Sequence, residues 1–279
     1  MLTFPNAKIN IGLNITEKRS DGFHNIESVF YPVEWCDALE IIPNQNPDAT
    51  NAVFQSSGLA IPGNESSNLC LKAWNLLQDR IGVPPIIHLH KVIPMGAGLG
   101  GGSADGAFTL RMLNEVYELK LSNDELKDFA RKLGSDCAFF IENRPVFCFN
   151  KGDEFEDFTL DLKGKFVVLV NPDIHISTAE AYSGVSPKKP QIALKTALSQ
   201  DISTWKEVVK NDFEEKLLLK YPSIAAVKET LYQAGAVYAS MTGSGSTVYG
   251  IFDNESECRT IDLKSSFPNF AMWQGTLKS

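Results

Sequence analysis

The amino-acid sequence predicts an α+β protein with two domains. The first observation is a strand, loop and helix in succession: the alternating run 86–93 leads through a glycine-rich stretch, 94–107, into a helix over 103–114. The second is the order strand, helices, strand, strand, helix, strand after residue 165, which is typical of a ferredoxin-like domain. The third is the length of 279 residues with 43% hydrophobic content, which suits two cores better than one. An acidic loop over 152–165 separates the two parts, so we expect domains over 1–160 and 161–279.

The first domain begins with a half-buried strand over 7–15, in which Ile and Leu alternate with polar residues. Lys8 and Asn10 share the polar face, which the pattern alone predicts to be solvated. A turn at 20–24 leads into an extended run over 26–33, and loops with a short strand at 52–55 follow over 43–68. Asn68 is the expected N-cap of a helix that ends before Gly82. A helix over 124–133 stops at Gly134, and Asp136 is a possible cap of a short helix through residue 140.

The second domain follows a possible strand at 147–151 and begins with a buried strand over 166–170. Helices are predicted over 178–183, 204–219 and 223–234, the last ending at Gly235. Strands over 237–241 and 247–252 form a hairpin around the turn 242–246. A helix over 255–265 and a strand over 270–273 complete the expected order.

Composition limits the classes of partner. A formal net charge of −8 and a pI near 5.1 argue against nucleic acid or an anionic membrane. The five cysteines are odd in number and scattered without metal-ligand spacing, so we expect reduced, mostly buried thiols. No basic, apolar leader and no run of membrane-spanning length is present, so we expect a cytoplasmic protein.

The glycine-rich stretch requires a physical explanation, because six of its fourteen residues are Gly96, Gly98, Gly100, Gly101, Gly102 and Gly106. Glycine is needed where the backbone takes a positive φ or approaches a ligand closely. The helix that follows presents free N–H groups and a partial positive charge at its N-terminus. Together these features predict a phosphate-binding loop.

Three known glycine motifs fit this stretch poorly. A Walker loop needs Lys and then Ser or Thr after its last glycine, and no such lysine is present. Gly96, Gly98 and Gly101 match the dinucleotide fingerprint, but a helix start at 121–125 stands where a second parallel strand is required. No His-Arg-Asp or Asp-Phe-Gly sequence follows, which excludes a protein-kinase loop.

Residues 94–104, Pro-Met-Gly-Ala-Gly-Leu-Gly-Gly-Gly-Ser-Ala, resemble the second motif of the GHMP kinases, a family named for galactose, homoserine, mevalonate and phosphomevalonate. Residues 7–10 resemble the first motif, 133–136 the catalytic acid segment and 242–245 the third motif. The resemblance therefore extends from Ala7 to Thr242. It implies an N-terminal, ATP-binding domain like domain 2 of ribosomal protein S5, and a ferredoxin-like C-terminal domain.

The resemblance also implies a reaction and its machinery. We expect phosphoryl transfer from ATP with Mg²⁺, with Asp136 as the general base and Lys8 close to it, stabilising negative charge. The Ser103 hydroxyl is a possible Mg²⁺ contact. The implied ATP-binding residues are Asn68, Lys91, Pro94, Met95, Gly96, Ala97, Gly98, Leu99, Gly100, Gly101, Gly102, Ser103 and Ala104.

The implied acceptor is a small molecule that carries a cytidine diphosphate group. In the kinases that this chain resembles, a histidine corresponding to His24 faces the hydrogen-bonding edge of cytosine, and aromatic rings corresponding to Phe30 and Tyr182 stack on it. The implied substrate-binding residues are Asn10, Phe23, His24, Phe30, Thr178, Tyr182, Gly243 and Ser244. The chain departs from the pattern in two places: Phe23 replaces a frequent tyrosine, and Cys137-Ala138 replaces a proline.

Alternatives remain for each part of this interpretation. Tyr182, one helical turn after Thr178, is of a kind that usually belongs to a core. A GHMP kinase for another alcohol and a nucleotide-binding module without catalysis are the competing functions. We expect a monomer or weak homodimer with no nucleic-acid or membrane partner.

Overall fold

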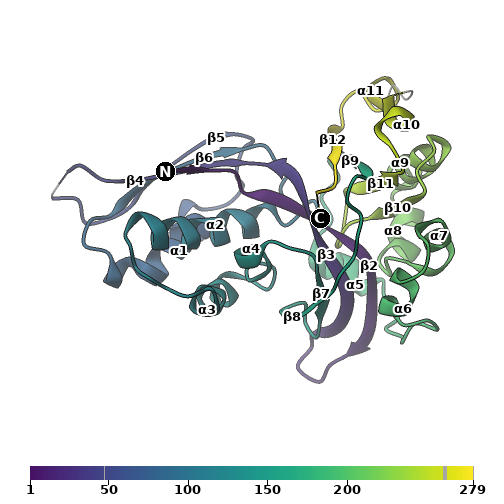
Figure 1. Ribbon diagram of the computed structural model, residues 1–279, viewed down its shortest axis with the longest axis horizontal. Helices are drawn as coiled ribbons and strands as arrows, with labels where there is room; N and C mark the ends of the chain where they lie inside the picture. The colour runs from purple at the N-terminus through teal and green to yellow at the C-terminus, as the bar shows by residue number, and fades with distance from the viewer. Residues whose placement is uncertain (47, 260–262, 279) are drawn as a thin grey trace. The chain divides into compact units, whose positions relative to one another are not determined.

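The computed structural model describes residues 1–46, 48–259 and 263–278 (Figure 1). The chain forms two compact units, the first made of Met1–Ala7, Trp35–Met95 and Gly100–Arg144, the second of Lys8–Glu34, Gly96–Leu99 and Pro145–Ser279. These bounds interleave because β2 (Asn6–Lys18) and β3 (His24–Cys36), early in the chain, share a sheet with β7 (Val146–Phe149) and β8 (Glu154–Asp157). The expected domain division at residue 160 stays a prediction, since compact units and evolutionary domains need not share bounds.

The first unit is a four-stranded sheet covered on one face by helices (Figure 1). Its strand order is β1 (Leu2–Thr3), β4 (Ala38–Pro43), β6 (Pro85–Lys91) and β5 (Val53–Gly58), with β5 parallel to β6. The helices are α1 (Leu69–Leu77), α2 (Gly101–Val116), α3 (Asn123–Leu133) and the short α4 (Phe139–Glu142). Ile87 and Leu89 of β6 are buried, and His90 between Leu89 and Lys91 is exposed. The two-residue period of the strand thus decides which side chains enter the core.

The helix ends follow the local sequence. The Asn68 side chain accepts a hydrogen bond from the N–H of Cys70, which confirms it as the N-cap of α1. Ser122 and Glu125 form a capping box at the start of α3, and Gly134 ends that helix as predicted. The cap predicted for the next helix is wrong: α4 starts after Ala138, with no side-chain cap, so Asp136 does not serve it.

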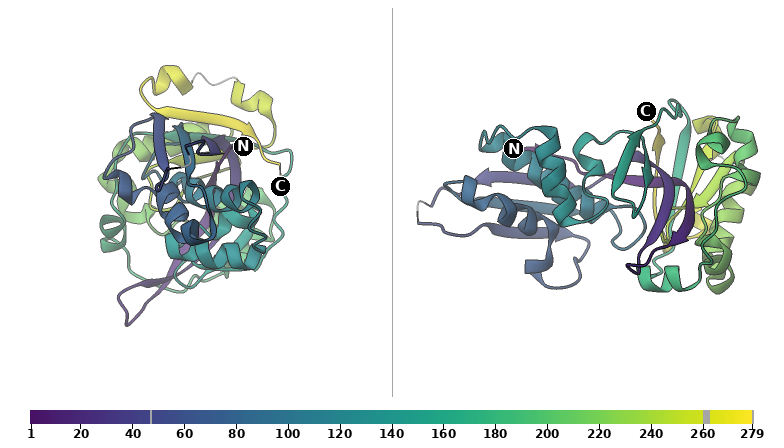
Figure 2. Two further views of the ribbon diagram at one scale, coloured as in Figure 1. Left: turned by 90° about the vertical axis from the view of Figure 1, so that its left-hand side faces the viewer. Right: turned by 90° about the horizontal axis from the view of Figure 1, so that it is seen from below.

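The second unit contains two four-stranded sheets, of which the first has the order β2-β3-β7-β8. The other is built from β9 (Phe166–Asn171), β10 (Tyr238–Met241), β11 (Val248–Phe252) and β12 (Ala271–Thr276), all antiparallel, in the order β10-β11-β9-β12. The first strand lies between the third and the fourth, which is the ferredoxin-like arrangement and confirms the predicted fold. The green helices α7 (Trp205–Val208) and α9 (Pro222–Gln233) pack on this sheet (Figures 1 and 2).

Two other predictions for this unit are corrected. The helix expected over 204–219 is interrupted, and α7 is followed by an extended segment before α8 (Glu214–Lys220). The interruption arises because the backbone of Leu13 donates to the carbonyl of Lys210 and accepts from the N–H of Asp212, both at 2.8 Å. The same pairing covers β2, whose residues 6–15 are all buried, so its polar face is not solvated.

The remaining helices of the second unit are short. They are α5 (Thr178–Ser183), which was predicted, and α6 (Leu194–Leu198), which was not. The helix predicted over 255–265 corresponds to α10 (Glu255–Arg259) and α11 (Leu263–Ser266), and its residues 260–262 lie outside the described part of the chain.

The five cysteines form no disulfide bonds with one another, and all but Cys36 are buried, which agrees with the expectation of mostly buried thiols. Within the described residues, none of the helices combines the length and the apolar character needed to cross a bilayer.

Candidate functional site

Thr242 brings together three segments that carry separate motifs in the sequence. Its hydroxyl donates to the carbonyl of Gly98 at 3.1 Å and accepts the N–H of Asn10 at 3.0 Å. Gly98 has a φ of +79°, and a Cβ there would lie 2.1 Å from the carbonyl oxygen of Thr242. Only glycine fits such an approach. The first motif, the glycine-rich stretch and the third motif therefore meet inside the second unit.

Lys8 is held beneath this junction. Its Nζ donates to Asn10 Oδ1 at 2.5 Å and lies 4.5 Å from the centre of the Phe30 ring. The Asn10 amide in turn donates to the Ser28 hydroxyl at 2.9 Å. The prediction that Lys8 and Asn10 share a face is confirmed, and only 3% of Lys8 is exposed. The ammonium is thus a preorganised positive charge with little rotational freedom.

The second half of the glycine-rich stretch, in the first unit, opens α2. Gly100 is its N-cap with a φ of +70°, and Gly101, Gly102 and Ser103 form the first turn. The N–H groups of a first turn have no partner within the helix. This turn therefore has the hydrogen-bond donors that a phosphate group requires.

The segment after Gly134 reaches this first turn through Cys137. The Ser103 side chain is hydrogen-bonded to the Cys137 thiol, and burial raises the pKa of that thiol to about 12. Ser135 donates to Asp136 Oδ1 at 3.3 Å, and Asp136 is half-buried. The residue that replaces the expected proline therefore contacts a predicted ATP-binding residue.

Asn68 lines a small cavity of the first unit. The cavity measures about 180 Å³ and is lined by Phe54, Ser56, Ile61, Gly63, Asn64, Glu65 and Asn68. The predicted partner Lys91 does not line it, and the Lys91 side chain is only 1% exposed, paired with Asp37 and Asp105. Asn68 thus lies beside a cavity, with its side-chain oxygen engaged as the cap of α1, whereas the Lys91 ammonium is paired with two carboxylates.

His24 and Tyr182 form a stacked pair in the second unit. Their ring centroids lie 4.6 Å apart with an interplanar angle of 21°, and Phe213 meets Tyr182 edge-on at 5.0 Å. Burial and the charge of Lys18 lower the pKa of His24, so its ring is neutral at pH 7. A neutral imidazole has one donor and one acceptor nitrogen.

Three other predicted substrate-binding side chains differ in exposure. Phe30 is 2% exposed and packs on Phe155 at 5.9 Å, beneath Lys8. Phe23 is 59% exposed, with Lys151 Nζ 5.5 Å from its ring centre, and Thr178 is exposed at the start of α5. Their role toward a substrate stays a prediction.

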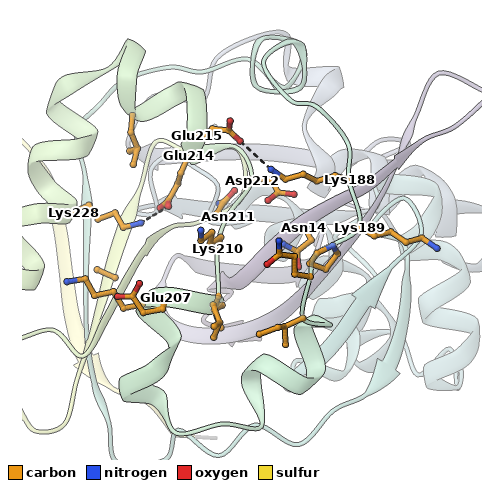
Figure 3. A pocket seen from close by; sticks show the side chains of 18 of the residues that line it. Asn14, Lys188, Lys189, Glu207, Lys210, Asn211, Asp212, Glu214, Glu215 and Lys228 are labelled. Atoms are coloured by element: carbon orange, nitrogen blue, oxygen red, sulfur yellow. Dashed lines mark hydrogen bonds and ion pairs between the residues drawn. The ribbon is translucent and has the colours of Figure 1, made fainter.

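A pocket of about 940 Å³ in the second unit contains none of the predicted residues (Figure 3). Its walls carry charges of both signs, with Glu214 paired to Lys228 at 2.6 Å. From its floor, Asn211 donates to the carbonyls of Met241 and Gly243, at 2.7 and 2.9 Å, and Glu214 accepts the N–H of Met241. Asn211 and Glu214 support the third motif, a role that nothing in their sequence context indicates.

Comparison with known proteins decides the family. The model for the GHMP kinases N terminal domain matches residues 68–144, and the model for the GHMP kinases C terminal matches residues 193–260. The 4-diphosphocytidyl-2-C-methyl-D-erythritol kinase of Cytophaga hutchinsonii is 52% identical over 92% of this chain and 94% of its own length. The chain belongs to the 4-diphosphocytidyl-2-C-methyl-D-erythritol kinases of the GHMP family. It is therefore a small-molecule kinase that uses ATP.

Other GHMP kinases agree with this assignment. The enzyme of the same name from Bacteroides fragilis is 48% identical over 96% of this chain and 97% of its own length. A crystal structure of 4-(cytidine 5'-diphospho)-2C-methyl-D-erythritol kinase superimposes with a TM-score of 0.85 at 26% identity, covering 100% of both chains. The mevalonate kinase of Methanococcus jannaschii, at 15% identity and a TM-score of 0.73 over 100% of this chain and 98% of its own, shares the fold.

Within each of the two units, the structure brings together some of the predicted residues of this GHMP kinase. In the second unit, Lys8, Asn10, Phe30, Gly98 and Gly243 lie around Thr242, and His24 stacks on Tyr182. In the first unit, Ser103 is joined to the Asp136 segment through Cys137.

Sequence reasoning missed the two carboxylates that pair with Lys91. The available signal was the position of this lysine in the alternating run 86–93, where it occupies a position that the alternation otherwise gives to apolar, core-facing side chains. A buried lysine requires a counter-charge, because an unpaired buried charge is strongly unfavourable.

Proposed function

We propose that this kinase transfers the γ-phosphoryl group of ATP to the 2-hydroxyl of 4-diphosphocytidyl-2-C-methyl-D-erythritol, a step in non-mevalonate isoprenoid precursor biosynthesis. The observation that carries the proposal is the 52% identity, over 92% of the chain, to a relative named for that substrate. The motif matches at 7–10, 94–104 and 133–136 support it.

The residues present fit ATP. Outside the local backbone, a Cβ at Gly102 would meet no described heavy atom within 4 Å, so the first turn of α2 has open space beside its free N–H groups. We assign the β- and γ-phosphates to this turn. The cavity at Asn68 is the proposed adenine site.

The residues also fit Mg²⁺. Magnesium favours oxygen ligands and is commonly bound through one or two protein groups together with substrate phosphates. The Ser103 hydroxyl is the proposed protein ligand. Among the described residues no group of three or more His, Cys, Asp and Glu side chains is arranged for a metal, so the nucleotide phosphates would supply most of the coordination. Bound with ATP, Mg²⁺ neutralises phosphate charge.

Asp136 and Lys8 are the proposed catalytic residues. The Asp136 carboxylate accepts the proton of the attacking hydroxyl, and the Lys8 ammonium stabilises the negative charge that develops on that oxygen. Because Asn10 and the Phe30 ring hold Lys8, its charge is in place before the substrate binds.

The His24–Tyr182 pair supports an acceptor that carries a nucleotide. Cytosine presents both donors and acceptors on its edge, which a neutral imidazole can match, and flat rings stack on aromatic side chains. A mevalonate or homoserine substrate has no ring that needs such a surface.

The test is turnover by the purified protein with ATP, Mg²⁺ and 4-diphosphocytidyl-2-C-methyl-D-erythritol, measured as ADP release. Activity on mevalonate or homoserine without activity on this acceptor would overturn the substrate assignment. ATP binding without phosphoryl transfer to any of the three would support a binding module instead.

Asp136→Asn tests the proposed base. We expect a loss of kcat of about a hundredfold or more, because general bases contribute at least that much. The control is Asp128→Asn, an exposed aspartate of α3 paired with Arg131, which should keep wild-type kcat. Near wild-type kcat in Asp136→Asn would remove the base assignment.

We further propose that the enzyme acts in the cytoplasm as a monomer or weak homodimer. Light scattering at several protein concentrations tests the oligomeric state.

A further inference from the structure

Three ionisable side chains form a buried cluster in the first unit. Lys91, at the end of β6, donates from Nζ to Asp37 Oδ2 and, at 2.8 Å, to Asp105 Oδ2. The side chains of Lys91, Asp37 and Asp105 are 1%, 0% and 4% exposed. We call these three residues the Lys91 cluster.

The cluster is an unfavourable way to fill a core. It places two carboxylates against one ammonium, and Asp105 Oδ1 is buried without a hydrogen-bond partner among the described residues. Buried ion pairs are often replaced by apolar side chains with no loss of stability. Ile87 and Leu89, the two preceding core positions of β6, show that apolar side chains suit this face. The cluster therefore calls for an explanation other than stability.

The chain segments that it joins suggest that explanation. Asp37 Oδ1 accepts the N–H groups of Val92 and Ile93, at 2.6 and 2.8 Å, which fixes the backbone where β6 leads toward the glycine-rich stretch. Asp105 lies in α2, two residues after Ser103. The Lys91 cluster thus connects the backbone before that stretch to the helix after it.

The first residue of α2 rests directly on the cluster. A Cβ at Gly101 would lie 2.9 Å from Ile93 Cγ2 and 3.0 Å from Lys91 Nζ. Gly101 has no φ in the left-handed region, so close approach is the reason for glycine here. Ile93 and Lys91 therefore determine how closely the first turn of α2 approaches the sheet.

We propose that Lys91, Asp37 and Asp105 are positioning residues for ATP, which hold the first turn of α2 so that its N–H groups meet the phosphates. This rests on the proposed function of that turn. Lys91 acts here through Gly101 and Ile93, with its ammonium buried against the two carboxylates. The cluster sets the affinity for ATP and leaves the affinity for the acceptor unchanged.

The test removes one buried charge of each sign and keeps the volume, while Asp37 retains its hydrogen bonds from the N–H groups of Val92 and Ile93. In Lys91→Met with Asp105→Leu, we expect a folded protein whose KM for ATP rises about tenfold or more, because small displacements of a positioning group have effects of this size. KM for the acceptor should stay at its wild-type value. The matched control is Lys127→Met with Glu142→Leu, which removes a 2.6 Å ion pair between α3 and α4 and should leave both KM values unchanged.

A single variant covers the case in which the double variant does not fold. Asp105→Asn keeps the side-chain size and one acceptor oxygen for Lys91, and we expect a rise in KM for ATP without a rise in KM for the acceptor. A folded variant with wild-type KM for ATP, or an equal rise in both KM values, would overturn the proposal.

Direct binding separates this proposal from the proposed reaction. Calorimetric titration of each protein with a non-hydrolysable ATP analogue and Mg²⁺ requires no acceptor. Weaker binding by the cluster variants supports the positioning role even if wild-type enzyme fails to turn over the assigned acceptor. Equal binding by wild type and variants contradicts it.

Discussion

Gly102→Ala is a direct test of the phosphate site, because it adds one methyl group at a position that the protein leaves open. No described heavy atom outside the local backbone lies within 4 Å of the new Cβ, and the φ of Gly102 is outside the left-handed region. Gly102 is the second residue of α2, and alanine in a helix is favoured over glycine by up to about 1 kcal/mol. The free energy of unfolding should therefore rise slightly or stay the same.

ATP binding should respond in the opposite direction. The methyl group would occupy the space assigned to the phosphates, so we expect the Kd for ATP to increase about tenfold or more, which corresponds to about 1.4 kcal/mol. Thermal unfolding and calorimetric titration measure the two effects separately.

Gly82→Ala is the matched control. Gly82 also has open space at its Cβ position and no left-handed φ, and it lies outside the glycine-rich stretch. Its ATP affinity should equal that of the wild type. A Gly102→Ala protein that is stable and binds ATP with wild-type affinity would refute the placement of the phosphates at this turn.

Further predictions concern other parts of the molecule. Gly98→Ala should lower the free energy of unfolding by about 2 kcal/mol or more, because its Cβ would lie 2.1 Å from the Thr242 carbonyl oxygen; an unchanged denaturation midpoint would show that the loop can relax. Tyr182→Ala should raise KM for the cytidine-bearing acceptor and leave KM for ATP unchanged, and equal changes in both would remove this ring from the acceptor site. Burial raises the pKa of Asp105 to about 7, so its neutral form stabilises the fold fully at low pH and this contribution is lost as pH rises through 7. The stability of wild type relative to Asp105→Asn should therefore fall as pH rises from 4 to 8, and a constant difference in thermal unfolding would contradict this. Ser122→Ala should cost about 1 kcal/mol of stability through the lost capping box, with wild-type kcat and KM in steady-state assays.

Features encoded over a few neighbouring residues could be predicted from the sequence. The N-cap at Asn68, the helix start at 121–125 and the glycine-opened α2 each depend on residues within one turn of the helix end that they form. The order of strands and helices after residue 165 was sufficient to predict the ferredoxin-like sheet, because few topologies accommodate this order.

Features that depend on distant partners could not be predicted. The helix expected over 204–219 is broken because residues 210 and 212 pair with Leu13, a contact that local propensity does not encode. In the Lys91 cluster, Lys91 pairs with Asp37, which lies 54 residues earlier in the chain, and with Asp105, which lies 14 residues later. Phe30 matched a motif as a stacking ring, and only the structure shows it buried beneath Lys8.

The junction at Thr242 limits how this protein can be divided. Asn10 and Thr242 are 232 residues apart in the chain, yet their hydrogen bond lies inside one compact unit. Dividing the chain at a single point between Asn10 and Thr242 therefore separates residues that pack in the same core. A chimera with a related kinase should exchange residues 8–34 and 96–99 together with the C-terminal part, because a single crossover between residues 99 and 210 leaves both the Gly98 contact and the β2 pairing with mismatched partners.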